Sequence, residues 1–294
     1  MHYHGPIVRP QTDADSIFFE VTVGCTHNNC TFCNFYDGYP FRVAPLSQVE
    51  ADLQEAAANF PHAKKVWASG GNPFALSVNK LATLAKLFKK YLPEAIISTY
   101  ARVDDITSKS VDDLKMLREL GFEILVLGIE TGDDDVLTHV KKGYTSEDIL
   151  RECKKIESAG IAWRVIYLGG LAGEGKCVES AKRTAAVLNE LHPFNMMLTT
   201  VAVLRGTELY NEMQQGKWVE AGEKERLMEF RTLLAELKNP INVYSVTSTV
   251  SFPFVVDLPE GKKEILRHLD DEIASVTEDY DNMVRASRAR MTSV

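Results

Sequence analysis

The chain has 294 residues, and its 33 Lys and Arg against 41 Asp and Glu give a net charge of −8. With 45% hydrophobic and 25% charged residues it has the composition of a folded globular protein, which excludes disorder as its main state. The acidic balance argues against broad nucleic-acid binding. No apolar run approaches the roughly 18 residues that cross a bilayer, and the polar segment 1–15 is not a secretory signal. We therefore expect no membrane association.

Strand-like apolar runs alternate with helical patterns along the first three quarters of the chain. We predict strands at 17–23, 65–69, 95–101, 122–129, 162–168 and 197–204, with helices at 46–59, 78–91, 110–120, 133–140, 146–159 and 178–191. This alternation indicates a parallel sheet, because parallel neighbours need crossover connections. The predicted fold is α/β, a full or partial parallel barrel of about six strand–helix units.

The remaining segment, 223–294, is mostly helical in pattern, with one β-branched stretch at 242–250. We predict a core over 1–222 and a helical C-terminal extension over 223–294 that packs on it. In barrels and open parallel sheets alike, ligands bind beyond the carboxyl ends of the strands. Candidate functional residues are therefore sought in the loops that follow the predicted strands.

Three of the five cysteines, Cys25, Cys30 and Cys33, lie within nine residues just after the first predicted strand. An odd number without an export signal argues against disulfides and favours a reducing, cytoplasmic location. Three thiolates at this spacing form a candidate metal site. A closed zinc site needs a fourth ligand, such as His27 or a distant His, whereas a 4Fe–4S cluster on three thiolates leaves one iron open. The spacing alone leaves both readings open.

The loop resembles the cluster motif of the radical S-adenosylmethionine (SAM) superfamily, where an aromatic residue precedes the third cysteine as Phe32 does here. The commoner spacing is C-x3-C-x2-C. This chain has one additional residue between Cys25 and Cys30, and in this respect it is similar to a sub-family of stand-alone radical SAM proteins. The resemblance implies a 4Fe–4S cluster on the three cysteines, SAM at the open iron, and a 5′-deoxyadenosyl radical that acts on an unidentified substrate. It also implies a small flavodoxin- or ferredoxin-like electron donor.

The resemblance extends to loops after later strands. Gly70, Gly71 and Asn72 match a Gly-Gly-Glu-Pro segment whose backbone binds the SAM amino group, with Asn in the Glu place. Glycines allow such a close approach, although an ordinary strand-to-helix turn has the same pattern. Glu130, in Gly-Ile-Glu-Thr-Gly, matches a residue that faces the methionyl or ribose end of SAM.

Four further residues complete the predicted SAM contacts. Arg102 follows the third strand, where related proteins have a polar residue on SAM and where an ion-pair partner is equally expected. Gly170 matches a glycine-rich segment that supports adenine, and Leu204 a backbone contact to it. Lys142 lies twelve residues after Glu130, where the similar coproporphyrinogen-oxidase group has a basic partner for the SAM carboxylate. The alternative is that Lys141 and Lys142 only favour the helix C-terminus.

Two other functions remain open from the residues alone. One is a non-catalytic zinc or iron–sulfur binding protein, and the other is a cluster protein that passes electrons to a partner. Cys153 and Cys177 stand apart from the cysteine loop, and we expect both to be inert buried thiols.

Overall fold

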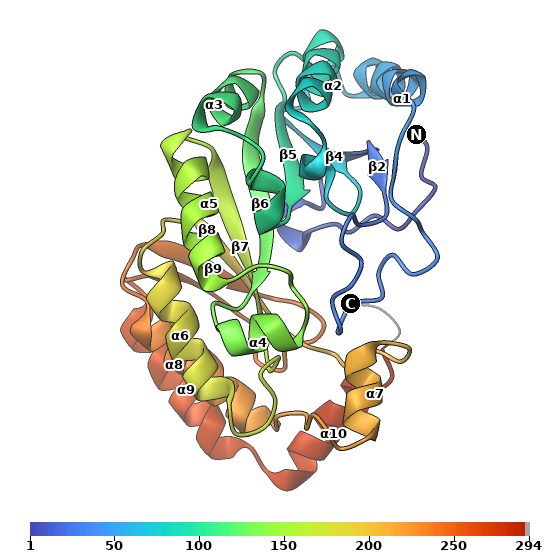
Figure 1. Ribbon diagram of the computed structural model, residues 1–294. Helices are drawn as coiled ribbons and strands as arrows, with labels where there is room; N and C mark the ends of the chain where they lie inside the picture. The colour runs from blue at the N-terminus through green and yellow to red at the C-terminus, as the bar shows by residue number, and fades with distance from the viewer. Residues whose placement is uncertain (292–294) are drawn as a thin grey trace. The chain divides into compact units, whose positions relative to one another are not determined.

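A computed structural model describes residues 1–291 of the chain (Figure 1). Eight strands form one sheet in the order β1 (Ile17–Glu20), β4 (Lys65–Ser69), β5 (Ile96–Ala101), β6 (Phe122–Glu130), β7 (Ala162–Gly169), β8 (Asn195–Thr200), β9 (Ile241–Ser245) and β10 (Phe254–Leu258). The pairs β1–β4, β4–β5, β5–β6 and β8–β9 are parallel. The predicted α/β fold with a mainly parallel sheet is confirmed, and the linear strand order corresponds to a partial barrel.

The helices follow the strands as predicted, with most ends within two residues. They are α1 (Leu46–Asn59), α2 (Val78–Tyr91), α3 (Val111–Glu119), α4 (Asp134–His139), α5 (Ser146–Ser158), α6 (Cys177–Leu188), α7 (Glu208–Gln214), α8 (Glu223–Glu236), α9 (Lys262–Ser275) and α10 (Glu278–Arg288). Three short 3-10 helices are η1 (Gln11–Asp13), η2 (Pro73–Ala75) and η3 (Val103–Ile106). Within residues 1–291, every helix is too short or too polar to cross a bilayer.

The first predicted strand, 17–23, is wrong as a single element. It divides into β1 and β2 (Thr22–Val23), and β2 pairs with β3 (Arg42–Val43) in a separate two-stranded sheet. The reason lies in the register: Glu20 pairs with Ser69, the last residue of β4, so later residues have no partner strand left there. The last predicted strand, 197–204, likewise ends early, at Thr200.

The C-terminal segment differs from the prediction in one respect. We expected helices packed on the core, but two strands of this segment extend the sheet, because β9 pairs parallel with β8 and β10 pairs antiparallel with β9. The predicted β-branched stretch at 242–250 therefore contains a sheet strand only over its first part, up to Ser245. The division into 1–222 and 223–294 stays a prediction.

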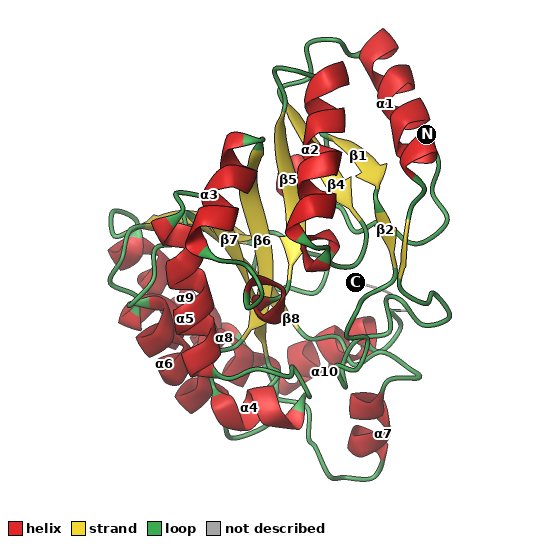
Figure 2. Cartoon of the chain, turned by 45° about the horizontal axis from the view of Figure 1, so that its top comes forward, coloured by secondary structure: helices red, strands yellow, loops and turns green. Residues whose placement is uncertain are grey.

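The described chain forms two compact units that are interleaved in sequence. The first contains 1–28, 35–128 and 151–164, and the second contains 29–34, 129–150 and 165–294. In the first unit, Trp67 stacks on Phe18 with ring centroids 5.2 Å apart and contacts Tyr100 at 5.0 Å. Helices α1 and α2 lie side by side there, with α1 against β1 (Figure 2).

The second unit has its own apolar core. Buried residues from α4, α6, α7 and the loops after β7 and β8 form one cluster, which includes Val140, Leu171, Leu209 and Trp218. Phe32 of the cysteine loop packs against this cluster. Helices α6, α8 and α9 run next to one another, with α8 in contact with both neighbours (Figure 1). This core therefore supports the second half of the cysteine loop.

Candidate functional site

The cysteine loop follows β2, and two backbone hydrogen bonds hold its middle in place. The Thr31 N–H donates to the Val140 carbonyl at 3.1 Å, and the Thr31 carbonyl accepts from the Leu209 N–H at 2.8 Å. Cys25, Cys30 and Cys33 form no disulfide, and all three are partly exposed. Within residues 1–291, no three His, Cys, Asp or Glu side chains are gathered as metal ligands. The donor set is nevertheless what a soft metal or an iron–sulfur cluster requires, namely several accessible thiols in one loop.

Gly70 and Gly71 lie directly against the start of this loop. A Cβ added at Gly71 would be 2.1 Å from the carbonyl oxygen of Gly24, and one at Gly70 would be 2.0 Å from Oγ1 of Thr22. Gly70 also has a φ of +146°, which side chains rarely adopt. The glycines thus allow the backbone after β4 to meet the backbone before Cys25. The structure brings these predicted residues together, as the resemblance implies.

Asn72 uses its side chain rather than only its backbone. Its Oδ1 accepts from the Thr26 N–H at 3.0 Å, and its Nδ2 donates to Thr26 Oγ1 at 2.7 Å. The same Nδ2 lies 3.0 and 3.1 Å from the two carboxylate oxygens of Asp105, in η3. Asn72 is only 1% exposed. Sequence reasoning assigned it a backbone role and missed Asp105 entirely.

Arg102 is half of an ion pair in the structure. Its Nε lies 2.9 Å from Oδ1 of Asp104, and its backbone N–H donates to Oδ2 of Asp105 at 2.8 Å. The side chain is buried, in contrast to its partner Asp104. The ion-pair interpretation of Arg102 is therefore seen directly, and its contact with SAM stays a prediction.

Glu130, Lys142 and Phe32 lie together in the second unit. Lys142 Nζ is 3.2 Å from Oε1 of Glu130 and 6.0 Å from the ring centroid of Phe32, and it is also 5.5 Å from the ring of Tyr144. Lys142 is buried, and Glu130 is nearly so. Lys141, the alternative cation, is instead exposed and pairs with Glu208. The two residues assigned to SAM by the spacing of twelve thus form an ion pair with each other.

Gly170 is held by a buried carboxylate that the sequence did not reveal. Its N–H donates to Oε2 of Glu229 at 2.6 Å, and the other carboxylate oxygen accepts from the Tyr167 hydroxyl at 2.6 Å. Burial raises the pKa of Glu229 to about 7, although the hydrogen bonds from Tyr167 and Gly170 oppose this. Arg226 lies beside it, fully buried, and donates to the Val201 carbonyl at 2.8 Å.

The sequence analysis did not identify Glu229 and Arg226, because the sequence of α8 is typical of a solvent-exposed helix. Its sequence is rich in charges, and nothing in their spacing distinguishes those that turn inward. Leu204 is buried in the middle of the loop after β8, where its carbonyl accepts from the Thr207 hydroxyl at 2.7 Å. Cys153 and Cys177 are buried, as expected, and burial raises the pKa of both thiols.

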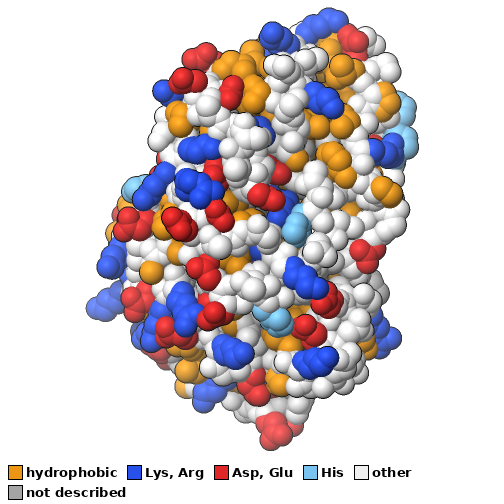
Figure 3. Space-filling model, viewed as in Figure 1, with side chains coloured by type: hydrophobic (Ala, Val, Ile, Leu, Met, Phe, Trp, Pro, Cys, Tyr) orange, Lys and Arg blue, Asp and Glu red, His pale blue; other side chains and the backbone are white. Residues whose placement is uncertain are grey.

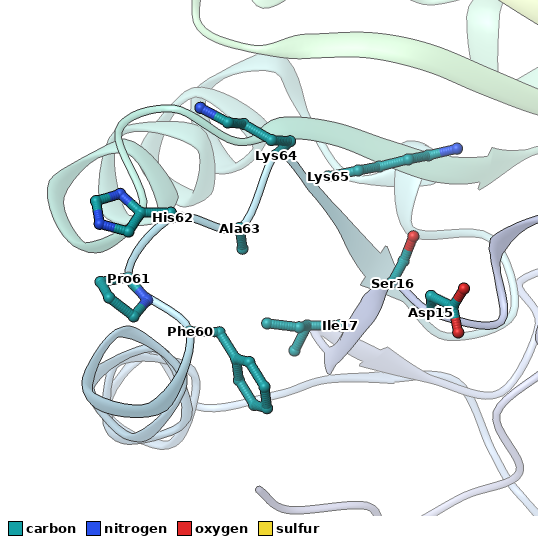
Figure 4. A pocket seen from close by; sticks show the side chains of 9 residues that line it. All are labelled: Asp15, Ser16, Ile17, Phe60, Pro61, His62, Ala63, Lys64 and Lys65. Atoms are coloured by element: carbon teal, nitrogen blue, oxygen red, sulfur yellow. The ribbon is translucent and has the colours of Figure 1, made fainter.

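A separate pocket lies away from these loops, at the amino ends of β1 and β4. It measures about 510 Å³ and is lined by Asp15–Ile17 and 60–65. Figure 4 shows Ile17 and Phe60 around the opening, with the amino groups of Lys64 and Lys65 directed away from it. On the face shown in Figure 3, basic and acidic side chains are interspersed. The lining of this pocket contains no residue of the cysteine loop.

Comparison with known families and proteins agrees with this geometry. A family model described as the radical SAM superfamily matches residues 19–180, which is more than half of the chain. The heme chaperone HemW of Bacillus subtilis is 26% identical over 204 residues, covering 66% of this chain and 52% of that protein. A putative methylthiotransferase of Methanocaldococcus jannaschii is 26% identical over 152 residues, covering 50% of this chain and 33% of that protein.

Solved structures show a shared fold. Coproporphyrinogen III oxidase (HemN) from Escherichia coli, 20% identical, superposes with a TM-score of 0.56 over 75% of this chain and 51% of that one. Methylornithine synthase (PylB), 15% identical, gives 0.55 over 92% and 85%. The chain spans about half the length of HemW and of HemN.

Proposed function

Since the chain belongs to the radical SAM superfamily, we propose that it binds a 4Fe–4S cluster and SAM and cleaves SAM reductively to act on a substrate yet to be identified. The observation that supports this most directly is the cysteine loop. It offers three partly exposed thiols that form no disulfide, and Phe32 directly precedes the third of them. Family membership itself implies both the cluster and SAM.

The three thiolates would hold three irons and leave the fourth to SAM. When bound, the reduced cluster would give one electron to the sulfonium of SAM, which breaks the S–C5′ bond and yields methionine and a 5′-deoxyadenosyl radical. The chain's own part is to bind and orient SAM and to exclude water and oxygen. The close backbone approach at Gly70 and Gly71 leaves peptide groups, rather than side chains, beside the start of the cysteine loop.

In the second unit we assign the SAM carboxylate to Lys142. Glu130, 3.2 Å from the Lys142 amino group, is assigned to the methionyl or ribose end of SAM. On the adenine side, Glu229 accepts a hydrogen bond from the Gly170 N–H, and Leu204 lies in the loop after β8. Arg102 remains a proposed contact on the first unit.

The substrate is not assigned. The relatives are named for different functions, a heme chaperone and a methylthiotransferase, so membership implies the cofactor chemistry and not the molecule acted upon. We further propose a flavodoxin- or ferredoxin-like electron donor. A cytoplasmic location is part of the same proposal, because thiols that bind a cluster must stay reduced.

The test is anaerobic SAM cleavage with matched cysteine variants. Purified protein is expected to carry about four irons per chain and, with dithionite, to release 5′-deoxyadenosine and methionine. Replacing Cys25, Cys30 and Cys33 together by Ala should remove both iron and cleavage. The matched control, Cys153→Ala with Cys177→Ala, should keep both.

Four outcomes would contradict the proposal. Iron that survives the triple replacement would place the cluster elsewhere, and zinc in place of iron would favour the non-catalytic reading. A complete cluster without SAM cleavage would favour electron transfer. Release of methylthioadenosine instead of 5′-deoxyadenosine would show that a different bond of the sulfonium is broken.

A further inference from the structure

Asn72 stands between the cysteine loop and a buried carboxylate. Its Oδ1 accepts from the Thr26 N–H at 3.0 Å, and its Nδ2 donates to Thr26 Oγ1 at 2.7 Å. The same amide nitrogen reaches both carboxylate oxygens of Asp105, at 3.0 and 3.1 Å. Thr26 directly follows Cys25 in the chain. The carboxamide therefore links the first cysteine to Asp105 through two hydrogen-bonded steps.

Asp105 is itself held in place. It is 8% exposed, and its Oδ2 accepts from the Arg102 N–H at 2.8 Å. Its backbone carbonyl accepts from Lys109 Nζ at 2.7 Å, which fixes the end of η3. Burial raises the pKa of Asp105 to about 6, the hydrogen bonds from Arg102 and Asn72 lower it, and nearby Asp104 raises it. The group is thus a buried carboxyl whose two oxygens both accept hydrogen bonds from N–H donors.

The residue at position 72 must therefore donate a hydrogen bond. Asn does so, whereas the Glu of the resembling Gly-Gly-Glu-Pro segment would bring a second carboxylate toward Asp105. Two carboxylates at about 3 Å cannot both be charged, so one would have to take up a proton or move away. Asn at 72 and Asp at 105 are consequently matched: an amide donor faces an anionic acceptor.

We propose that Asp105 is a positioning residue for the cysteine loop, acting through the Asn72 carboxamide on Thr26, and that this is why Asn stands at position 72. Its relevance to catalysis rests on the proposed function. The arrangement itself involves only residues of the first unit. It can therefore be measured whether or not SAM is cleaved.

The experiment exchanges the two partners. Asn72→Asp, Asp105→Asn and the double variant Asn72→Asp/Asp105→Asn are compared as full chains purified anaerobically, with iron content recorded for each. The readout is amide hydrogen exchange at Thr26, whose N–H is the one bound by Asn72. The Val126 amide in β6 reports on the rest of the unit, and Asp112→Asn, with a 95% exposed side chain, is the matched control.

We expect Asn72→Asp to speed exchange at Thr26 by roughly tenfold or more, because it opposes two carboxylates. Asp105→Asn should increase the exchange rate at Thr26 by less, since the carboxamide oxygen of the new side chain can still accept a hydrogen bond from Asn72. The double variant restores one amide donor against one carboxylate, and exchange should return to within about twofold of the natural chain. Val126 and the Asp112→Asn control should not change, and iron retention should follow exchange at Thr26.

Unchanged exchange at Thr26 in both single variants would overturn the proposal. So would a double variant in which the two single effects simply add, since matched partners must compensate. An equal increase of amide exchange at Thr26 and Val126 would show that Asp105 only stabilises the unit in general, and would also contradict the proposal. Failure of the natural chain to cleave SAM would instead count against the proposed function and leave these exchange rates unaffected.

Discussion

Glu130 has the left-handed backbone conformation that glycine usually occupies, with a φ of +69°. For a residue with a Cβ this costs on the order of 1–3 kcal/mol, and such residues concentrate at functional sites. The conformation occurs at the end of β6, where the carboxylate pairs with buried Lys142. A helix-capping role for Lys142 would require neither the strained backbone of Glu130 nor a buried ion pair between the two residues. The geometry therefore favours the functional reading of both residues.

Lys142→Ala should weaken SAM binding by about 1.5–3 kcal/mol, the usual range for a hydrogen bond to a charged group. The physical reason is that the SAM carboxylate loses its cation, and Glu130 is left without this partner. Iron content should stay normal, because Lys142 provides no thiolate. Isothermal titration of SAM into the reconstituted variant measures the change.

Lys141→Ala is the matched control, since Lys141 is 45% exposed and pairs with Glu208 instead. Its affinity for SAM should equal that of the natural chain. A loss in Lys141→Ala with none in Lys142→Ala would move the role by one residue. No loss in either would leave only the helix-capping reading.

At the scale of elements, α8 places buried ionisable side chains against the carboxyl ends of two strands. Glu229 accepts the Gly170 N–H just after β7, and Arg226 donates to Val201 just after β8. A Cβ on Gly170 would lie 2.8 Å from the Arg226 guanidinium, so the glycine is required for this packing. The C-terminal segment thus contributes to the loop expected to support adenine.

The raised pKa of Glu229 predicts a pH dependence of stability. Folding raises this pKa from 4.5 to about 7, so the folded chain keeps a proton that the unfolded chain releases. Its stabilising contribution is complete below about pH 4.5 and is lost as the pH rises through about 7. The free energy of unfolding of the natural chain minus that of Glu229→Gln should therefore fall between pH 5 and pH 8.

Urea unfolding at the two pH values measures this difference, which we expect to be at most about 3 kcal/mol. Comparison with Glu229→Gln cancels the contribution of Asp105, whose pKa is also raised. Glu236→Gln, on the exposed side of the same helix, should show no such change. A constant difference for Glu229→Gln across the range would be evidence against a protonated Glu229.

At the scale of the molecule, the amino-terminal lead-in is tied to strands far along the chain. Asp13 in η1 is buried and forms ion pairs with Lys65 at the start of β4 and Arg164 near the start of β7. Arg164 also donates to Thr12 Oγ1 at 2.7 Å. One carboxylate therefore compensates two largely buried cations. These strand ends are the opposite ones from the candidate site, where stability rather than chemistry is expected.

Asp13→Ala should lower the free energy of unfolding by about 3–5 kcal/mol, because it leaves the two cations without their carboxylate. Chemical denaturation of the iron-free chain at pH 7 measures the loss. Asp15→Ala removes an exposed carboxylate two residues away and should have little effect. Equal losses in the two variants would show that the ion pairs contribute nothing specific.

The sequence by itself determined the alternation of elements and the chemistry of the cysteine loop. Apolar runs such as 65–69 and helical patterns such as 78–91 coincide with β4 and α2, because local periodicity reports which side chains are buried. The three cysteines were likewise found from their spacing, and Phe32 and the glycines at 70 and 71 from the family resemblance. Such motifs are local in the chain, and their chemistry depends on residue type.

Only the tertiary structure decided which side chains meet. Nothing local shows that Asn72 faces Asp105, that Glu130 pairs with Lys142, or that Glu229 reaches Gly170, 59 residues away. The same holds for β9 and β10, whose pattern gives no sign of a place in the main sheet. Partners separated by tens of residues are selected by packing, and burial then sets their hydrogen bonds and charge, as the raised pKa of Glu229 shows.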